Sequence, residues 1–211
     1  MARRKVLSKA KVYLVLDADV CPYSRLQEAL RLAVKAGVKI IQLRDKRGSA
    51  GKIMAFAGKT RRYWKGRSLF IVNDRVDVAL ACGADGVHLG RDDIPLGEAR
   101  KLAGPRLIIG ASCQTLAHLR QAQQEGADYI GFGSVFRTRT KPQRRPMDLA
   151  LLASAAKAAR IPLFAIGGIT PANAVKVVEA GASRIAVTRS ILLARDVGRT
   201  IKELHAVLKG R

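Results

Sequence analysis

The sequence has no long uncharged apolar segment. A membrane-spanning helix needs about 18 consecutive apolar residues, and no stretch of the 211-residue chain reaches that length. The first residues, Met1-Ala2-Arg3-Arg4-Lys5, lead into Val6-Leu7 and not into the apolar core of a signal peptide. These absences predict a cytoplasmic protein without a membrane partner.

Cysteines, aromatic residues and acidic residues are also scarce. Cys21, Cys82 and Cys113 lack the spacing of a zinc site or a disulfide framework, so we expect three free thiols. Asp and Glu number 16 against 39 Lys and Arg, which gives a formal net charge of +23. This charge suits anionic ligands, but it does not choose between nucleic acid, a membrane surface and phosphorylated metabolites.

What the sequence does contain is a series of short apolar runs rich in Val and Ile. A hydrophobic content of 48% predicts a folded chain, and most runs are apolar on both faces, as in parallel strands covered on two sides. Segments with helical spacing separate them. The runs are residues 12–16, 39–43, 69–72, 86–89, 107–109, 129–132, 163–166 and 184–187.

Dividing 211 residues among eight strand–helix units gives about 26 residues per unit, which fits a compact α/β fold of the (β/α)₈ TIM-barrel type. An open doubly wound sheet is the alternative. A short glycine-containing segment recurs before the second, fourth, sixth and eighth runs, and this internal repeat favours the barrel. We expect a basic N-terminal arm over residues 1–10 and a single barrel domain over residues 11–211.

Polar residues follow the apolar runs, and in a TIM barrel the active site is built at these strand ends. Two carboxylates, Asp74 and Asp93, facing Lys and Arg groups in one cleft suit a Mg²⁺ ion that bridges to a diphosphate. The segment Gly167-Gly168 and the segment Thr188-Arg189 follow the seventh and eighth runs, where barrels bind a monophosphate. His88 lies within an apolar run, where a packed, hydrogen-bonded histidine is more common than a base.

Taken together, these segments resemble the thiamine phosphate synthase family over nearly the whole chain from Lys11. The resemblance rests on six segments in order at successive strand ends. They are Gln42-Leu43-Arg44-Asp45-Lys46, Asn73-Asp74-Arg75, Val87-His88-Leu89-Gly90 with Asp93, Gly110-Ala111-Ser112, Thr138-Arg139-Thr140-Lys141, and Gly167-Gly168-Ile169-Thr170.

The resemblance implies an enzyme that joins a hydroxymethylpyrimidine diphosphate to a thiazole phosphate and releases pyrophosphate. It implies Mg²⁺ at Asp74 and Asp93 and a dissociative displacement, in which leaving-group charge is stabilised by Arg44, Lys46 and Lys141. The residues implied to hold the pyrimidine diphosphate are Gln42, Arg44, Lys46, Asn73, Ser112 and Lys141. Those implied around the thiazole phosphate are Thr138, Thr140, Gly168, Thr188 and Arg189, with Arg139 between the two threonines.

Three positions depart from the family pattern: Arg137, where proline is common, Arg189, where serine is common, and Gln114, where histidine is common. The two arginines add cations beside the implied thiazole phosphate. The alternatives are a thiazole tautomerase, which relies on a histidine after the sixth strand that is missing here, and a non-enzymatic nucleic-acid binder. With 5% aromatic residues and no recognition motif, no specific nucleic-acid partner is expected, and a homo-oligomer stays open.

Overall fold

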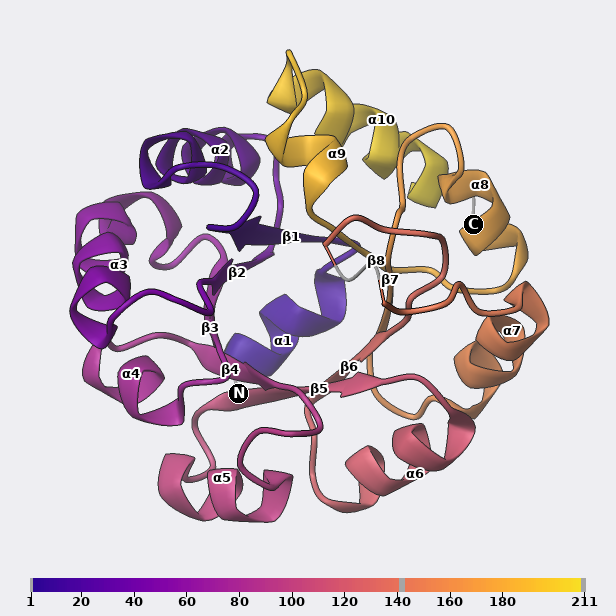
Figure 1. Ribbon diagram of the computed structural model, residues 1–211, viewed down its shortest axis with the longest axis horizontal. Helices are drawn as coiled ribbons and strands as arrows, with labels where there is room; N and C mark the ends of the chain where they lie inside the picture. The colour runs from indigo at the N-terminus through magenta and orange to yellow at the C-terminus, as the bar shows by residue number, and fades with distance from the viewer. Residues whose placement is uncertain (1, 141–142, 210–211) are drawn as a thin grey trace.

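The computed structural model describes residues 2–140 and 143–209. Eight parallel strands form a closed barrel in which each strand pairs with its sequence neighbours and β8 pairs with β1. The helices surround this barrel (Figure 1), which confirms the predicted TIM barrel. The strands are β1 (Val12–Asp17), β2 (Ile40–Arg44), β3 (Leu69–Asn73), β4 (Gly86–Leu89), β5 (Ile108–Cys113), β6 (Tyr129–Phe132), β7 (Leu163–Ile166) and β8 (Ile185–Val187).

Helices follow the strands and cover the outside of the barrel. Apolar residues at helical spacing, such as Leu26, Ala29, Leu30 and Ala33, bury one face of each helix against the strands. The helices are α1 (Ala2–Lys9), α2 (Tyr23–Lys35), α3 (Ala50–Trp64), α4 (Val76–Ala81), α5 (Leu96–Ala103), α6 (Leu116–Gln124), α7 (Leu149–Ala158), α8 (Ala174–Glu179), α9 (Arg189–Leu192) and α10 (Val197–Lys209).

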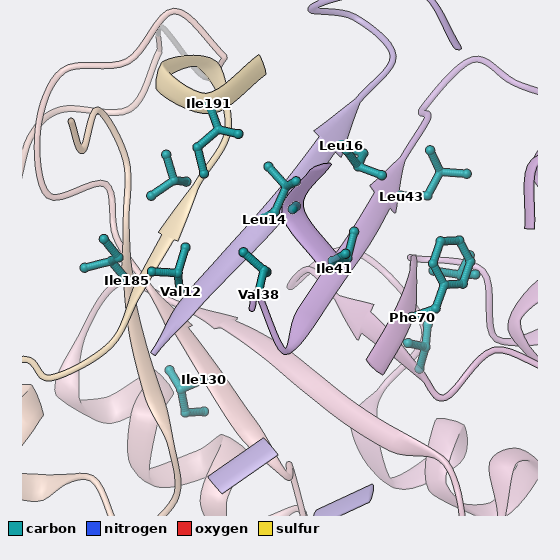
Figure 2. Close-up of a cluster of buried hydrophobic side chains, with 14 of the residues drawn as sticks. Val12, Leu14, Leu16, Val38, Ile41, Leu43, Phe70, Ile130, Ile185 and Ile191 are labelled. Atoms are coloured by element: carbon teal, nitrogen blue, oxygen red, sulfur yellow. The ribbon is translucent and has the colours of Figure 1, made fainter. Parts of the chain in front are cut away.

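Two apolar layers hold the barrel together. Val12, Leu14 and Leu16 of β1 pack in the layer between strands and helices (Figure 2), whereas Tyr13 and Val15 belong to a second buried cluster. Because successive side chains of a strand point to opposite faces, this second cluster fills the barrel interior. Burial of both faces thus explains why most positions in the runs are apolar.

Left-handed glycines end the helices before every second strand. Gly37, Gly83, Gly126 and Gly181 have φ angles between 62° and 89°, a region that side chains with a Cβ rarely adopt. This confirms the glycine-containing repeat described from the sequence. The three cysteines are free thiols, also as expected.

The N-terminal segment differs from the expected arm, because residues 2–9 form helix α1. Its Leu7 is 2% exposed and packs with Ile40 and Leu69, the first residues of β2 and β3. Helix α1 therefore closes the barrel end at which the strands begin, and it is visible through the barrel in Figure 1. Within the described residues, no helix is long and apolar enough to cross a membrane.

Candidate active site

A cavity of about 430 Å³ opens where the strands end, opposite α1. Every strand or the loop after it contributes to its walls, so the mouth gathers residues distant in sequence. Of the predicted site residues it is lined by Gln42, Arg44, Asn73, Ser112, Thr138, Arg139, Thr140, Gly168, Thr188 and Arg189. Lys141 lies outside the described residues.

The strand register brings a fully buried carboxylate beside a predicted cation. Asp17 and Arg44 are partners at the ends of β1 and β2. Arg44 Nη1 donates to both carboxylate oxygens of Asp17, at 3.0 and 2.9 Å, and to Asp19 Oδ2 at 3.2 Å. Asp19 in turn pairs with Arg47. Arg44 is therefore fixed at the mouth, and within the described residues its Nε and Nη2 groups donate no hydrogen bond, which leaves them available to an anion.

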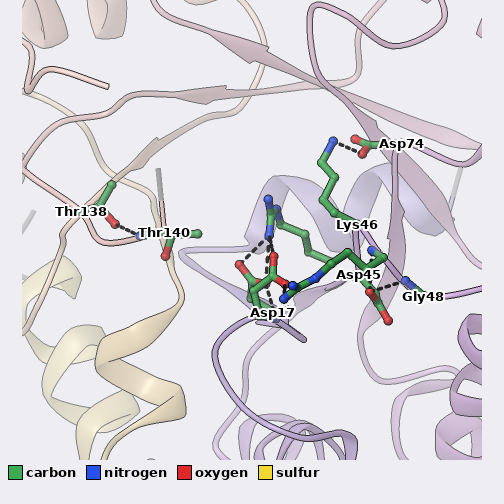
Figure 3. A network of polar contacts seen from close by, with 10 residues as sticks. Asp17, Asp45, Lys46, Gly48, Asp74, Thr138 and Thr140 are labelled. Carbon is green, nitrogen blue, oxygen red and sulfur yellow. Dashed lines mark hydrogen bonds and ion pairs between the residues drawn. The ribbon is translucent and has the colours of Figure 1, made fainter. Parts of the chain in front are cut away.

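Lys46, Asp74 and Asp93 form a second charged group at the rim. Lys46 Nζ pairs with Asp74, and Figure 3 shows both on the side of the mouth away from Thr138 and Thr140. Burial raises the pKa of the Asp74 carboxyl, the nearby Asp93 carboxyl raises it further, and Lys46 lowers it. Asp93 Oδ2 accepts from Gly90 N at 2.6 Å, which directs it toward a smaller adjoining cavity that shares Ser112 with the main one.

This pair of carboxylates fits a magnesium ion by its donor chemistry. Among residues 2–140 and 143–209, no group of three or more His, Cys, Asp or Glu side chains could hold a metal. Mg²⁺ needs no such group, because it is usually held by one or two carboxylates together with water and substrate phosphates. Burial is the main cause of the raised pKa of Asp74, and the neighbouring Asp93 carboxyl adds to it.

A chain of hydrogen-bonded polar side chains, buried at one end and half-buried at His88 and Ser112, crosses the barrel beneath the mouth. Gln42 Nε2 donates to Tyr13 Oη at 2.5 Å, and Tyr13 and Tyr129 hydroxyls lie 2.8 Å apart. His88 joins Tyr129 Oη, 3.1 Å from Nδ1, to Ser112 Oγ, 3.0 Å from Nε2. Burial raises the pKa of both tyrosines. His88 is thus a packed, hydrogen-bonded residue, and it orients Ser112 toward the cavity.

The loops after β6 and β7 are joined closely by the two glycines. Phe136 N donates to Gly167 O at 2.9 Å. Gly168 has a φ of 64°, and a Cβ there would lie 2.4 Å from Arg137 O. The glycines are therefore required by packing, and the same packing leaves Gly168 on the wall of the cavity.

Cations and a short helix after β6 and β8 complete the lining of the cavity. Arg189 begins helix α9 directly after β8 and lines the cavity with Thr188. Arg144 also lines it, and its Nη1 and Nε lie 3.0 Å from the side-chain amide oxygen of Gln114 when that amide is correctly oriented. Burial lowers the pKa of Arg144. The departure at position 114 thus supplies an acceptor for a mouth arginine.

The sequence analysis did not include Asp17, Tyr13, Arg144 or Thr170 among the site residues, although all line the cavity. Asp17 could have been found from the sequence, because it directly follows an apolar run, as the predicted site residues do. Tyr13 could not, because the sequence does not distinguish a tyrosine at a site from a tyrosine in the apolar core of a strand. Ser134 Oγ and Ser190 Oγ donate to the backbone carbonyls of Phe136 and Ile169.

Fold and mouth together define a TIM-barrel protein whose strand-end cavity is lined by several cations. Comparison with known proteins then identifies which barrel it is. The family model of thiamine monophosphate synthase matches residues 12–191, and the chain belongs to this family.

Individual relatives agree with the family match. The chain is 46% identical over 198 residues to a thiamine-phosphate synthase of Gloeobacter violaceus, covering 93% of this chain and 57% of that protein. It is 38% identical over 206 residues to one of Methanococcus maripaludis, covering 97% and 98%. A solved thiamine phosphate pyrophosphorylase from Pyrococcus furiosus superposes with a TM-score of 0.84 at 37% identity, over 98% of this chain and 97% of that one.

The relatives also bear on length and on the alternatives. The chain spans a little more than half of the Gloeobacter protein and about the whole of the Methanococcus and Pyrococcus proteins. None of these comparisons supports the open doubly wound sheet, the tautomerase or the non-enzymatic binder as alternatives.

Proposed function

We propose that this protein joins a hydroxymethylpyrimidine diphosphate to a thiazole phosphate, giving thiamine phosphate and pyrophosphate. The observation that carries the proposal is that one cavity holds cations from separate parts of the barrel: Arg44 at the end of β2, Arg139 after β6 and Arg189 after β8. A reaction that couples two phosphorylated substrates needs two anion sites within reach of a common centre. The relatives bear the matching name.

In this proposal, the wall formed by β2 and β3 holds the diphosphate. Arg44, held by Asp17, would donate its free N–H groups to the phosphate oxygens, and Lys46 would add a second positive charge. Asn73, Gln42 and Ser112 line the same part of the cavity and supply neutral hydrogen-bonding groups for the pyrimidine diphosphate. Lys141 is proposed to add a further positive charge that stabilises the diphosphate.

Asp74 and Asp93 would hold Mg²⁺ in this arrangement. Bound there, the ion would neutralise the charge that grows on pyrophosphate as its bond to the pyrimidine methylene breaks. Lys46 would keep Asp74 in place before the metal and substrate arrive.

The opposite wall would hold the thiazole phosphate. Thr188, Arg189 and Gly168 lie in the loops after β7 and β8, where barrels commonly bind a phosphate beside a short extra helix. Thr138, Arg139 and Thr140 approach from the loop after β6. The buried hydroxyl of Thr140 has no hydrogen-bond partner within the described residues, so a ligand oxygen there would satisfy it.

The test is to incubate the purified protein with both substrates and Mg²⁺ and to measure pyrophosphate and thiamine phosphate together. Equal amounts of the two products are expected, and omission of either substrate should abolish both. An Arg44→Gln variant should lose most of this activity, whereas Arg31→Gln, an exposed change on the outer face of α2, should not. A folded wild-type protein that releases neither product would refute the proposal.

A further inference from the structure

The barrel end closed by α1 presents exposed cations on a rigid frame. This closed end consists of α1 and of the loops that lead into the strands. Lys5 and Lys9 project from α1, and cations precede four of the strands. The exposed set is Lys5, Lys9, Lys39, Arg67, Arg106 and Arg160.

Two aspartates at this end are already neutralised. Asp85 accepts from Arg3 Nε at 2.7 Å and from Phe70 N at 3.1 Å. Asp128 accepts from Arg4 Nε at 2.9 Å and from Arg100 Nη2 at 2.6 Å. None of the six exposed cations has a carboxylate partner in the part of the chain that the structure describes. Even with Glu125 and Glu179 at the ends of α6 and α8, the closed end is strongly positive.

The frame that carries these cations is fixed at both ends of α1. Arg3 ties the start of the helix to the loops before β4 and β5, through Asp85 and through Arg106 O at 3.2 Å. Arg184, which precedes β8, donates to Ser8 O at 3.1 Å and ties down the other end. The helix therefore crosses the closed end from the side of β4 and β5 to the side of β8, and its Lys5 and Lys9 are exposed.

We propose that the closed end is a docking surface for double-stranded nucleic acid, contacted through its phosphate backbone without regard to sequence. Regularly spaced phosphates match cations spread over a broad face, and their neutralisation releases counterions. The proposal concerns a second surface on an enzyme, opposite the mouth, and it does not depend on the proposed activity.

The chemistry of the face favours a duplex over other polyanions. Single strands bind through exposed aromatic platforms, and the large exposed apolar side chains of the described chain are aliphatic. Membrane-surface helices insert apolar residues, but Val6 and Leu7 of α1 pack into the barrel. Protein interfaces are depleted of lysine and have an apolar centre, whereas the helix that crosses this face exposes Lys5 and Lys9.

The experiment measures binding of a fluorescent mixed-sequence DNA duplex by anisotropy over a series of salt concentrations. Wild type is compared with a closed-end variant, Lys5→Gln with Lys39→Gln and Arg106→Gln. The matched control removes the same charge from exposed cations of the outer helices, with Lys59→Gln, Arg120→Gln and Lys202→Gln. Circular dichroism and enzyme activity of both variants report that the fold is retained.

Wild type should bind with a logarithmic salt slope of about −0.9 per phosphate contacted. The closed-end variant should lose about 2 to 3 from the magnitude of that slope and at least about tenfold in affinity at low salt, and the control should stay close to wild type. Equal losses in both variants would mean diffuse attraction and overturn the proposal. So would the absence of duplex binding, or stronger retention on polyglutamate or on anionic lipid vesicles than on the duplex.

Discussion

Replacing Asp17 by asparagine tests whether this buried carboxylate positions Arg44. Asp17 is fully buried, the Arg44 side chain is 14% exposed, and the two share contacts of 2.9 and 3.0 Å. Asparagine keeps the shape and one acceptor oxygen but removes the charge. Arg44 is left with its 3.2 Å contact to Asp19 and with its own uncompensated charge.

The magnitude follows from the burial of the pair. Removing one partner of a buried pair costs about 3 to 5 kcal/mol, and a hydrogen bond to a charged group contributes about 1.5 to 3 kcal/mol. Because Arg44 keeps one partner and some solvent, we expect a loss of about 2 kcal/mol in the free energy of unfolding. A displaced Arg44 should also cost about 10- to 100-fold in kcat/KM for the pyrimidine diphosphate, at 1.4 kcal/mol per tenfold.

The direction in which kcat/KM changes in Asp17→Asn distinguishes a positioning role of Asp17 from its absence. Asp17 is itself a negative charge on the wall of an anion-binding cavity, so its removal should strengthen diphosphate binding if Arg44 held its place without it. Steady-state kinetics with each substrate varied in turn, together with urea unfolding, separate the two cases. Asp19→Asn, a change at an exposed carboxylate, should alter kcat/KM less than about threefold. Unchanged or improved kcat/KM in Asp17→Asn would refute the positioning role.

Three further predictions follow from single sites. Asp74→Asn and Asp93→Asn should each slow turnover roughly 10²- to 10³-fold without lowering the free energy of unfolding, because each carboxylate crowds the other; near-normal Mg²⁺-dependent turnover would contradict the metal assignment. Arg189→Ser should raise KM for the thiazole phosphate about tenfold, worth 1.4 kcal/mol, and leave KM for the pyrimidine substrate unchanged; equal changes in both would remove Arg189 from the phosphate wall. Leu7→Ala should lower stability by about 2 to 5 kcal/mol, since Leu7 is 2% exposed in the barrel interior, and urea unfolding with a midpoint equal to wild type would show that α1 is not part of the core.

The barrel and much of its mouth were predictable because both rest on short-range patterns. Strands buried on two sides carry apolar runs, and the polar residue that ends a run falls at the strand end, as with Asn73 at the end of β3. The run before Ser112 was underestimated, because Gly110 and Ala111 do not look like strand residues, yet β5 continues to Cys113. Small residues there make room for Tyr129, whose ring a Cβ at position 110 would meet at 2.1 Å.

Features that depend on distant partners were not predictable. Helix α1 looked like a charged arm, because its buried residues are few and their contacts come from the starts of β2 and β3. The hydrogen bonds among Gln42, Tyr13 and Tyr129 depend on strand register across the barrel interior. The Arg144 contact with Gln114 joins the loops after β5 and β6, and no local spacing relates these positions.

The two ends of the barrel differ in how their cations are held, and this difference sets what each end can bind. On the side of the mouth formed by β1 to β3, carboxylates hold the cations in fixed directions, as Asp17 holds Arg44, Asp19 holds Arg47 and Asp74 holds Lys46. A cation oriented before its ligand arrives loses little freedom on binding, so such a site favours small phosphates of defined shape. At the closed end, Lys5 and Lys9 have no carboxylate partner within the described chain. Long unpaired side chains can reach phosphates at many positions, which suits binding to a polymer. Their attraction to phosphate should weaken steeply as the salt concentration rises, whereas charges in the partly buried mouth are screened less. The proposed chemistry requires only the charged groups at the mouth. Much of the net charge of +23 is therefore not required by that chemistry. The cations of the closed end need a different ligand to explain them.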